Sequence, residues 1–223
     1  MIRRISFTRR AAGVGYDDFQ RHWRGPHAEL ARLLPDLRSY VQNHAVLGPE
    51  GPLLPYPGFD VCVELEYDSR EDMEASLTSP EYRGAAIADQ SGFTDMTHLM
   101  WMLVESPGVA QDPARPDAVK HMTFIRRTGA VESEQFEEAV LGPYADVIGE
   151  ATDGRRRELL LPSSGMRAGD PPPAFDAVDI VWFDNAGAAV AFTTSGVAQR
   201  ARWELGGRAA GIERLIARGL RVI

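Results

Sequence analysis

Apolar positions recur along the first half of the chain with two different periods. Residues three or four apart share one face of a helix, and this spacing links Tyr16, Phe19, Trp23, His27, Leu30 and Leu34. Residues 61–67 alternate between apolar and polar instead, which predicts a half-buried β-strand. Similar patterns predict strands at 2–9, 37–47 and 98–105 and a second helix at 69–83. The order strand, helix, strand, strand, helix, strand is that of a ferredoxin-like unit.

The second half of the chain repeats the first. Residues 19–30 align with residues 136–147 at a constant offset of 117, and both copies contain a glycine–proline pair. The pair Phe59–Asp60 recurs as Phe175–Asp176 at an offset of 116. Periodicity predicts the same element order here, with strands at 120–126, 155–161, 176–183 and 215–223 and helices at 131–148 and 185–199. Pro26 lies inside the first helical pattern and lacks a backbone donor, so we expect a kink or break there.

We therefore expect an α+β protein of two ferredoxin-like units, residues 1–105 and 118–223, joined by a linker at 106–117. Each unit has a four-stranded antiparallel sheet with two helices on one face. The other face needs cover, and the second copy supplies it, which closes an intramolecular α/β barrel. We expect a hollow inside this barrel, rimmed by the proline-rich loops at 47–58 and 161–174.

Composition narrows the possible partners and cofactors. A net charge of −8 and a pI near 5.2 argue against nucleic acid binding, which needs a basic surface. The sequence has no apolar run long enough to span a membrane, and its single cysteine, Cys62, suits a cytoplasmic protein without internal disulfides. The sequence has no metal-ligand spacing and no glycine-rich nucleotide motif. We expect no metal and no cofactor.

Several polar residues lie where burial is expected. Tyr40, Gln42 and His44 alternate, so they share one strand face, whereas Asn43 points to the opposite face. Buried polar groups are costly when unpaired, so the shared face either lines a cavity or is exposed to solvent. His27 lies on the apolar stripe of its helix, where an imidazole is either a packed core residue or an acid/base group active near neutral pH.

Two further patterns are less specific. Glu64 and Glu66 alternate with apolar residues and are expected on a solvated face. His98 is in register with Met100 and Met102 and is a candidate cavity residue. Trp23, beside His27 on the helical stripe, is a candidate for apolar contact with a ligand.

The first half resembles the EthD family of the dimeric α/β-barrel superfamily. The resemblance is carried by Phe19-x-x-x-Trp23-x-x-x-His27-Ala28, by Leu34-Pro35-x-Leu37-x-x-Tyr40-x-x-Asn43-His44, by Phe59-Asp60-x-x-x-Glu64-Leu65 and by Ser79-Pro80-Glu81-Tyr82. It implies a unit that pairs with a second copy, here within one chain. Members of the superfamily include cofactor-free dehydratases, cyclases and lactone isomerases, and also haem-dependent enzymes. Methylmuconolactone-isomerase-like relatives use a histidine and a tyrosine, which match His27 and Tyr40.

The combined hypothesis is a cofactor-independent lyase or isomerase that acts on a small cyclic or aromatic molecule. His27, Tyr40 and His44 are the predicted catalytic residues, and Trp23, Gln42, Asn43 and His98 are the predicted substrate contacts. The second copy has Tyr144 at the position of His27, which argues against two equal sites. The alternatives are a haem-dependent oxygenase and a non-catalytic binding or accessory protein. The tandem chain is also a candidate homodimer.

Overall fold

A computed structural model describes residues 1–106, 118–152, 155–163, 167 and 169–223. Of the expected linker, residues 106–117, only Ser106 lies within the described residues. The first unit comprises β1 (Ile2–Arg10), α1 (Tyr16–His22), η1 (Trp23–His27), α2 (Ala28–Ala31), β2 (Ser39–Ala45), β5 (Val61–Tyr67), α3 (Arg70–Thr78), η2 (Tyr82–Ala86), α4 (Ile87–Phe93) and β6 (Thr94–Glu105). A short hairpin of β3 (Leu47–Gly48) and β4 (Gly51–Pro52) extends from the loop after β2.

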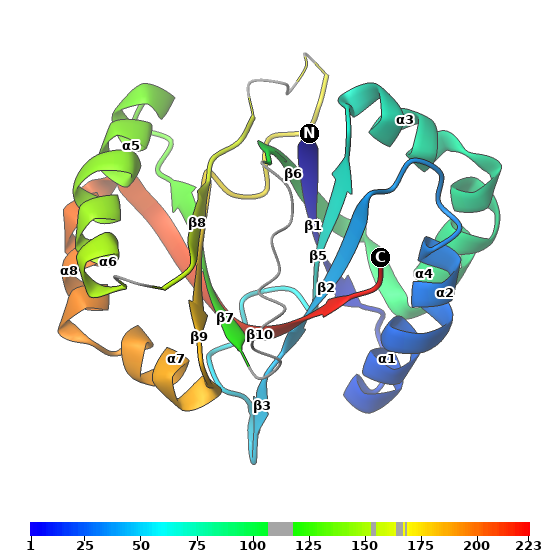
Figure 1. Ribbon diagram of the computed structural model, residues 1–223, viewed down its shortest axis with the longest axis horizontal. Helices are drawn as coiled ribbons and strands as arrows, with labels where there is room; N and C mark the ends of the chain where they lie inside the picture. Colours follow the sequence, from blue (N-terminus) through cyan, green and yellow to red (C-terminus); the bar gives the residue numbers. More distant parts are fainter. Residues whose placement is uncertain (107–117, 153–154, 164–166, 168) are drawn as a thin grey trace.

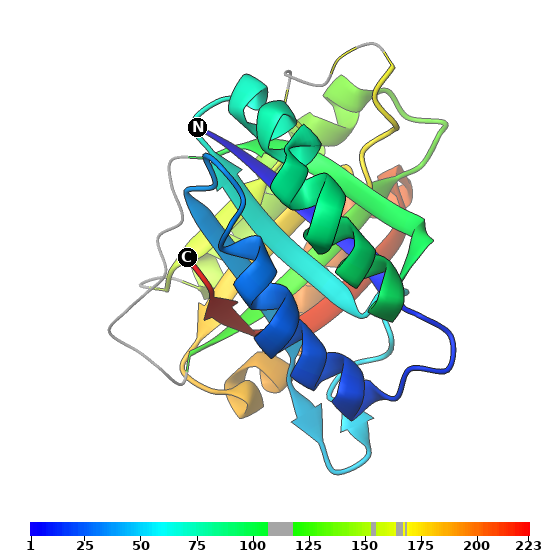
Figure 2. The ribbon, with the colours of Figure 1, turned by 90° about the vertical axis from the view of Figure 1, so that its right-hand side faces the viewer.

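The second unit repeats this plan. It comprises β7 (Val119–Arg127), α5 (Ser133–Ala139), η3 (Val140–Tyr144), α6 (Ala145–Ala151), β8 (Arg157–Leu160), β9 (Ala177–Phe183), α7 (Ala186–Thr193), α8 (Gly196–Leu205), η4 (Gly206–Arg208) and β10 (Ala209–Arg221). The helices of each unit cover the outer face of its own strands, and the two sets of strands face each other in the middle (Figure 1). Figure 2 shows the helices of the first unit lying across its strands. The predicted α+β fold with two ferredoxin-like units is confirmed.

All eight long strands form one antiparallel sheet, in the order β6-β1-β5-β2-β10-β7-β9-β8. The two units join where β10 pairs with β2, from Ala217 opposite Ala45 to Arg221 opposite Val41. On the other side, the segment between β8 and β9 closes the gap. Its backbone donates from Ser163 to Leu103 at 2.7 Å and from Ala174 to Trp101 at 3.0 Å. One side of the barrel is therefore closed by strand pairing and the other by a loop.

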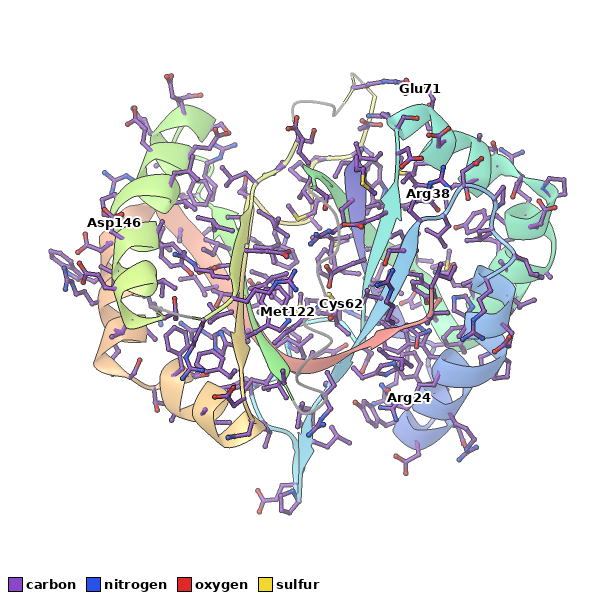
Figure 3. The ribbon with its side chains drawn as sticks, viewed as in Figure 1. Arg24, Arg38, Cys62, Glu71, Met122 and Asp146 are labelled. Carbon is purple, nitrogen blue, oxygen red and sulfur yellow. The ribbon has the colours of Figure 1, made fainter. Side chains whose placement is uncertain are left out.

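The interior of the barrel is filled by side chains from both units, including Cys62 and Met122 at the centre of Figure 3. Its middle is an aromatic cluster of Phe7, Phe59, Phe124 and Phe175. Phe7 and its repeat partner Phe124 meet edge to face, with ring centroids 5.5 Å apart. Edge-to-face packing is a favoured geometry for aromatic rings. The expected hollow inside the barrel is wrong, because these rings occupy that space.

A buried charged cluster fills the interior beside the aromatic rings. Arg3 contacts Glu64, Glu66 and Glu158 at 3.1, 2.9 and 2.8 Å, and Lys120 contacts Glu64 at 2.5 Å. Both glutamates of β5 are 1% exposed, so the expectation that they lie on a solvated face is wrong. The face opposite the helices is the barrel interior, where carboxylates are stable because cations from other strands pair with them.

The predicted break at Pro26 is instead a π-helical turn inside a continuous helix. The turn η1 holds Pro26, and η3 holds Pro143 at the equivalent place in the second copy. Proline has no N–H to donate to the carbonyl four residues back, and a π turn absorbs one extra residue without ending the helix. The turn places His27 at its last position, directly before α2.

Candidate functional site

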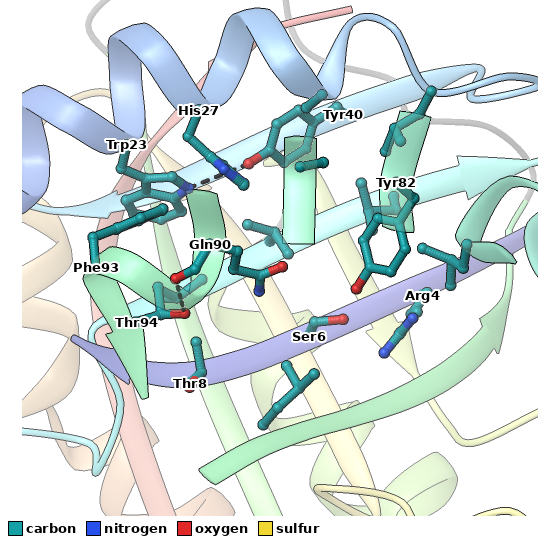
Figure 4. Close-up of a pocket in the computed structure, with 18 residues that line it drawn as sticks. Arg4, Ser6, Thr8, Trp23, His27, Tyr40, Tyr82, Gln90, Phe93 and Thr94 are labelled. Atoms are coloured by element: carbon teal, nitrogen blue, oxygen red, sulfur yellow. Dashed lines mark hydrogen bonds between the residues drawn. The ribbon is translucent and has the colours of Figure 1, made fainter. Parts of the chain in front are cut away.

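A cavity lies between the helices and the outer sheet face of the first unit, not inside the barrel. Its volume is about 60 Å³. Side chains of the strands and helices of the first unit line it, together with Leu34 in the loop after α2 (Figure 4). They are Arg4, Ser6, Thr8, Trp23, His27, Ala31, Leu34, Tyr40, Val61, Val63, Leu65, Leu77, Tyr82, Ala86, Gln90, Phe93, Thr94 and Leu99. Neither of the loops expected at its rim, 47–58 and 161–174, contributes a residue to this list.

The strand alternation explains which residues reach this cavity. Odd positions of β1, such as Arg3, face the barrel interior, so the even positions Arg4, Ser6 and Thr8 face the helices. On the helical side, Trp23 and His27 stand four residues apart on one face of the chain. The cavity is thus a gap in the layer where helices normally pack directly on a sheet.

His27 is held by a carboxylate that the sequence did not indicate. Its Nδ1 lies 2.9 Å from Oδ2 of Asp89 on α4, and the other oxygen, Oδ1, lies 2.7 Å from Nε2 of His22. A carboxylate only accepts hydrogen bonds, so Nδ1 of His27 carries a hydrogen. In the neutral ring Nε2 then has a free lone pair, and no described residue bonds to it. Burial lowers the pKa of His27 from 6.5, although Asp89 offsets part of this effect.

Tyr40 stands beside His27 as a neutral hydrogen-bond donor. Its hydroxyl oxygen accepts from Nε1 of Trp23 at 3.2 Å and from Nε2 of Gln42 at 3.1 Å. Both lone pairs are therefore used, and its own hydrogen has no acceptor among the described residues. Burial raises the pKa of Tyr40 to about 12, so the phenol keeps this hydrogen at neutral pH.

His44 lies behind this site and does not line the cavity. Its Nε2 is 2.9 Å from Oε1 of Gln42, and its Nδ1 accepts from Nε of Arg24 at 3.4 Å. Burial lowers the pKa of His44 to about 3, with a further contribution from Arg24. The same Nδ1 lies 2.5 Å from Oε1 of Gln20, so the ring is held between Gln42, Gln20 and Arg24. It borders the Gln42 amide that donates to Tyr40. His44 thus stands outside the cavity lining, and its acid/base role stays a prediction.

Two predicted substrate contacts lie elsewhere. Asn43 points into the barrel interior, as its alternation predicts, and donates to Oε1 of Glu64 at 2.8 Å. His98 is exposed on β6 and lies 2.5 Å from Oδ2 of Asp95. Gln42 is buried behind Tyr40 and donates to the backbone oxygen of Trp23 at 2.7 Å. Of the seven predicted site residues, His27, Tyr40 and Trp23 line the cavity.

The equivalent region of the second copy is filled differently. Tyr144 occupies the position of His27 and donates to Oδ2 of Asp179 at 3.0 Å. Arg157 donates to the same carboxylate at 2.8 Å, and Tyr144 packs in the apolar core of the second unit. A buried phenol in a hydrogen-bonded network stands here in place of the imidazole, so the arrangement around His27 is not repeated in the second copy.

The cavity between the helices and the sheet is small. Its volume of about 60 Å³ is less than half of the ~150 Å³ cavity that accepts benzene in a well-studied case. Leu77, Tyr82 and Gln90 in the lining are half-buried, and a ring-sized ligand requires such side chains to change rotamer. A four-pyrrole macrocycle exceeds this cavity, so the haem hypothesis needs a different site and stays a prediction. Within the described residues, no group of three or more histidine, cysteine, aspartate or glutamate side chains is arranged to hold a metal ion.

The fold and the site together define a dimeric α/β-barrel protein built from one chain, with a cavity between the helices and the sheet of its first unit. Residues 11–97 match the EthD domain model, so this half of the chain carries an EthD domain. The resemblance seen in the sequence is thereby confirmed for the half that holds the cavity.

Solved structures share the whole fold at low sequence identity. An anthrone oxidase-like protein superimposes with a TM-score of 0.67 at 15% identity, over 98% of this chain and 90% of its own. A monooxygenase candidate from Fusobacterium nucleatum gives 0.60 at 7% identity, over 98% and 92%. One from Lactobacillus acidophilus gives 0.52 at 12% identity, over 100% and 94%. These similarities concern the fold alone. No curated protein matches the sequence. Every helix in the described residues is too short or too polar to cross a membrane.

Proposed function

We propose that this protein is a cofactor-independent acid/base enzyme that removes a proton from a small cyclic or aromatic molecule. The observation that carries the proposal is the orientation of His27. Its Nδ1 is fixed on Asp89, so the free lone pair is on Nε2. Because His27 lines the cavity, this lone pair is available to a molecule bound there. A positioned base of this kind contributes roughly 10²–10⁴-fold in rate.

Tyr40 supplies the complementary group. When His27 takes a proton from a carbon next to a carbonyl, the electron pair moves to the carbonyl oxygen and forms an enolate. The free O–H of Tyr40 donates to that oxygen and stabilises its charge. Return of the proton to a different carbon completes an isomerisation, and departure of a β-hydroxyl with that proton as water completes a dehydration. These are the isomerase and lyase reactions that the sequence suggested.

A second outcome starts from the same step. An electron-rich enolate can also react with dioxygen, and three proteins of this fold bear names of oxidases or monooxygenases. Dioxygen then accepts electrons from the enolate, a C–O bond forms, and the resulting peroxide takes the proton from His27 and leaves as a hydroperoxide. Both reactions need His27 as the base, so the proposal rests on proton removal and not on the later product.

The test measures proton removal directly. The purified protein is mixed in D₂O with small aromatic and cyclic ketones that have an acidic C–H group, and deuterium incorporation is followed by NMR. We expect enzyme-dependent exchange that falls by roughly 10²-fold or more in His27→Gln. His98→Gln is a matched control, because it removes an imidazole that also pairs with an aspartate but lies outside the cavity. An oxygen electrode then separates isomerisation from oxygenation.

Binding without exchange, unaffected by His27→Gln, would instead indicate a non-catalytic binding protein. Homodimer formation by the tandem chain stays a prediction that size-exclusion chromatography with light scattering can test.

A further inference from the structure

The end of the cavity away from His27 contains a cation without a counter-ion. Arg4 on β1 lines the cavity there, as Figure 4 shows, and Nε of this guanidinium is enclosed without a hydrogen-bond partner. Its planar group lies over the ring of Trp101, 5.0 Å from the ring centroid. No carboxylate among the described residues pairs with it.

The neighbouring arginine, Arg3, has carboxylate partners that Arg4 lacks. Arg3, one residue earlier on the same strand, faces the barrel interior and contacts three carboxylates. Arg4 faces the opposite way, and the titratable groups near it are the phenols of Tyr67 and Tyr82. Arg4 as a whole is half-buried, but its Nε is enclosed without a partner, which is costly for a polar group, and burial lowers the pKa of Arg4. The fold therefore keeps an unpaired cation in a place where a ligand can reach it.

Two hydroxyl groups complete this end. Ser6 lies two residues from Arg4 on the same strand face, and Tyr82 lies across the cavity on η2 (Figure 4). Neither hydroxyl bonds to a described residue. A guanidinium fork with adjacent hydroxyls matches the geometry of a carboxylate, which accepts two parallel N–H bonds and further O–H bonds.

We propose that Arg4, with Ser6 and Tyr82, binds a carboxylate at the end of the substrate that is remote from the reacting carbon. The inference rests on the proposed function and narrows its substrate class to small cyclic or aromatic acids. The strand rise of about 3.3 Å per residue puts Arg4 and Thr8, at the two ends of the cavity, about 13 Å apart along β1. Arg4 and His27 both line the cavity, so a carboxylate bound at Arg4 directs the rest of the molecule into the space that His27 borders.

The test compares two probes of the same shape, benzoate and benzamide, by calorimetry and by the fluorescence of Trp23 and Trp101. We expect the unmodified protein to bind benzoate about 10- to 100-fold more tightly than benzamide. Arg4→Met should remove this preference, and Arg4→Lys should retain part of it. Arg21→Gln is the control for net charge, because Arg21 is exposed on α1 and pairs with Asp18. It should leave the preference unchanged.

The outcomes separate the two proposals. His27→Gln should lose proton exchange but keep the preference for benzoate. If the unmodified protein shows Arg4-dependent binding of benzoate but no proton exchange, the anion site is supported and the proposed enzyme activity is rejected. Equal affinity for both probes in the unmodified protein, binding of neither, or a preference that survives in a folded Arg4→Met protein would overturn the inference. If Arg4→Met does not fold, as judged by circular dichroism, the comparison of unmodified protein with Arg4→Lys decides.

Discussion

At the scale of single residues, the strongest prediction concerns Asp89. Its carboxylate fixes Nδ1 of His27 and partly offsets the lowering of the His27 pKa by burial. Proton removal requires neutral His27, so the exchange rate should rise with pH through the His27 pKa, below 6.5, and stay flat above it. In Asp89→Asn the pKa should fall further. The rising part of the profile should therefore move to lower pH, and the plateau should drop about tenfold because the base is weaker.

The measurement is the exchange rate in D₂O between acid and neutral pH. Asp95→Asn is a fair comparison, since Asp95 also holds a histidine, His98, but on the surface. If Asp89→Asn leaves both the profile and the plateau unchanged, Asp89 does not position the base.

The sequence predicts which residues share a face when they belong to the same helix or strand. Helical spacing identified Trp23 and His27, and strand alternation identified Tyr40 and placed Asn43 on the other face. Asp89 is different, because it lies 62 residues from His27 and belongs to no periodic motif. Arg4 gave no signal either, since only the three-dimensional structure shows which of two adjacent arginines has carboxylate partners.

At the scale of secondary structure, the π turn η1 sets the direction of His27, and the repeat offers a direct test. One residue corresponds to about 100° of rotation around an α-helix. Deletion of Gly25 should convert η1 to a regular helical turn and rotate His27 away from Asp89 and the cavity. We expect the loss of proton exchange to match that of His27→Gln, about 10²-fold or more.

Deletion of Gly142 is the matched control, because Gly142 stands at the same position of η3 in the second copy. It disturbs the corresponding turn, which is kinked at Gly142 (φ −98°, ψ −106°) and lies in the other unit, so exchange should persist if the protein folds. Thermal unfolding of both variants by circular dichroism shows whether the helices are retained. Full exchange activity without Gly25 would mean that the π turn does not orient the base.

The same turn shows the limit of prediction at this scale. A proline within a helical pattern signals the loss of one hydrogen bond, and Pro26 was expected to kink or break the helix. The helix absorbs one extra residue in the π turn, and both helical segments still pack their apolar faces on the sheet. The spacing of apolar residues therefore does not reveal the π turn. The repeat itself contained a hint, since the glycine–proline pair occurs at the same place in both copies.

At the scale of the whole molecule, the repeat predicted two units and their pairing correctly but not the contents of the interface. Alternation in β5 showed two faces, and the face with Glu64 and Glu66 was assigned to solvent. The charges that neutralise them come from β1 and from β7 of the other unit. A sequence pattern confined to one strand does not show these partners.

This interface leads to a prediction about stability. Burial alone would raise the pKa of Glu64, but Lys120, the only lysine in the chain, and Arg3 outweigh it and hold the pKa at about 2. Because the folded pKa lies below the unfolded value of about 4.3, ionised Glu64 stabilises the fold above that value, and this stability is lost as the pH falls toward 2. Lys120→Met removes one of the two cations. It should cost about 3–5 kcal/mol in the free energy of unfolding, because it leaves a buried carboxylate undercompensated.

Urea unfolding at neutral and acidic pH measures both effects. Lys120→Met should begin to lose stability at a higher pH than the unmodified protein, since the pKa of Glu64 rises without Lys120. The double variant Lys120→Met with Glu64→Gln removes both charges and keeps an amide oxygen for Asn43, so it should recover much of the lost stability. Equal losses in the single and double variants would show that Lys120 acts through packing against Trp182, 5.6 Å from its ring centroid, and not through its charge.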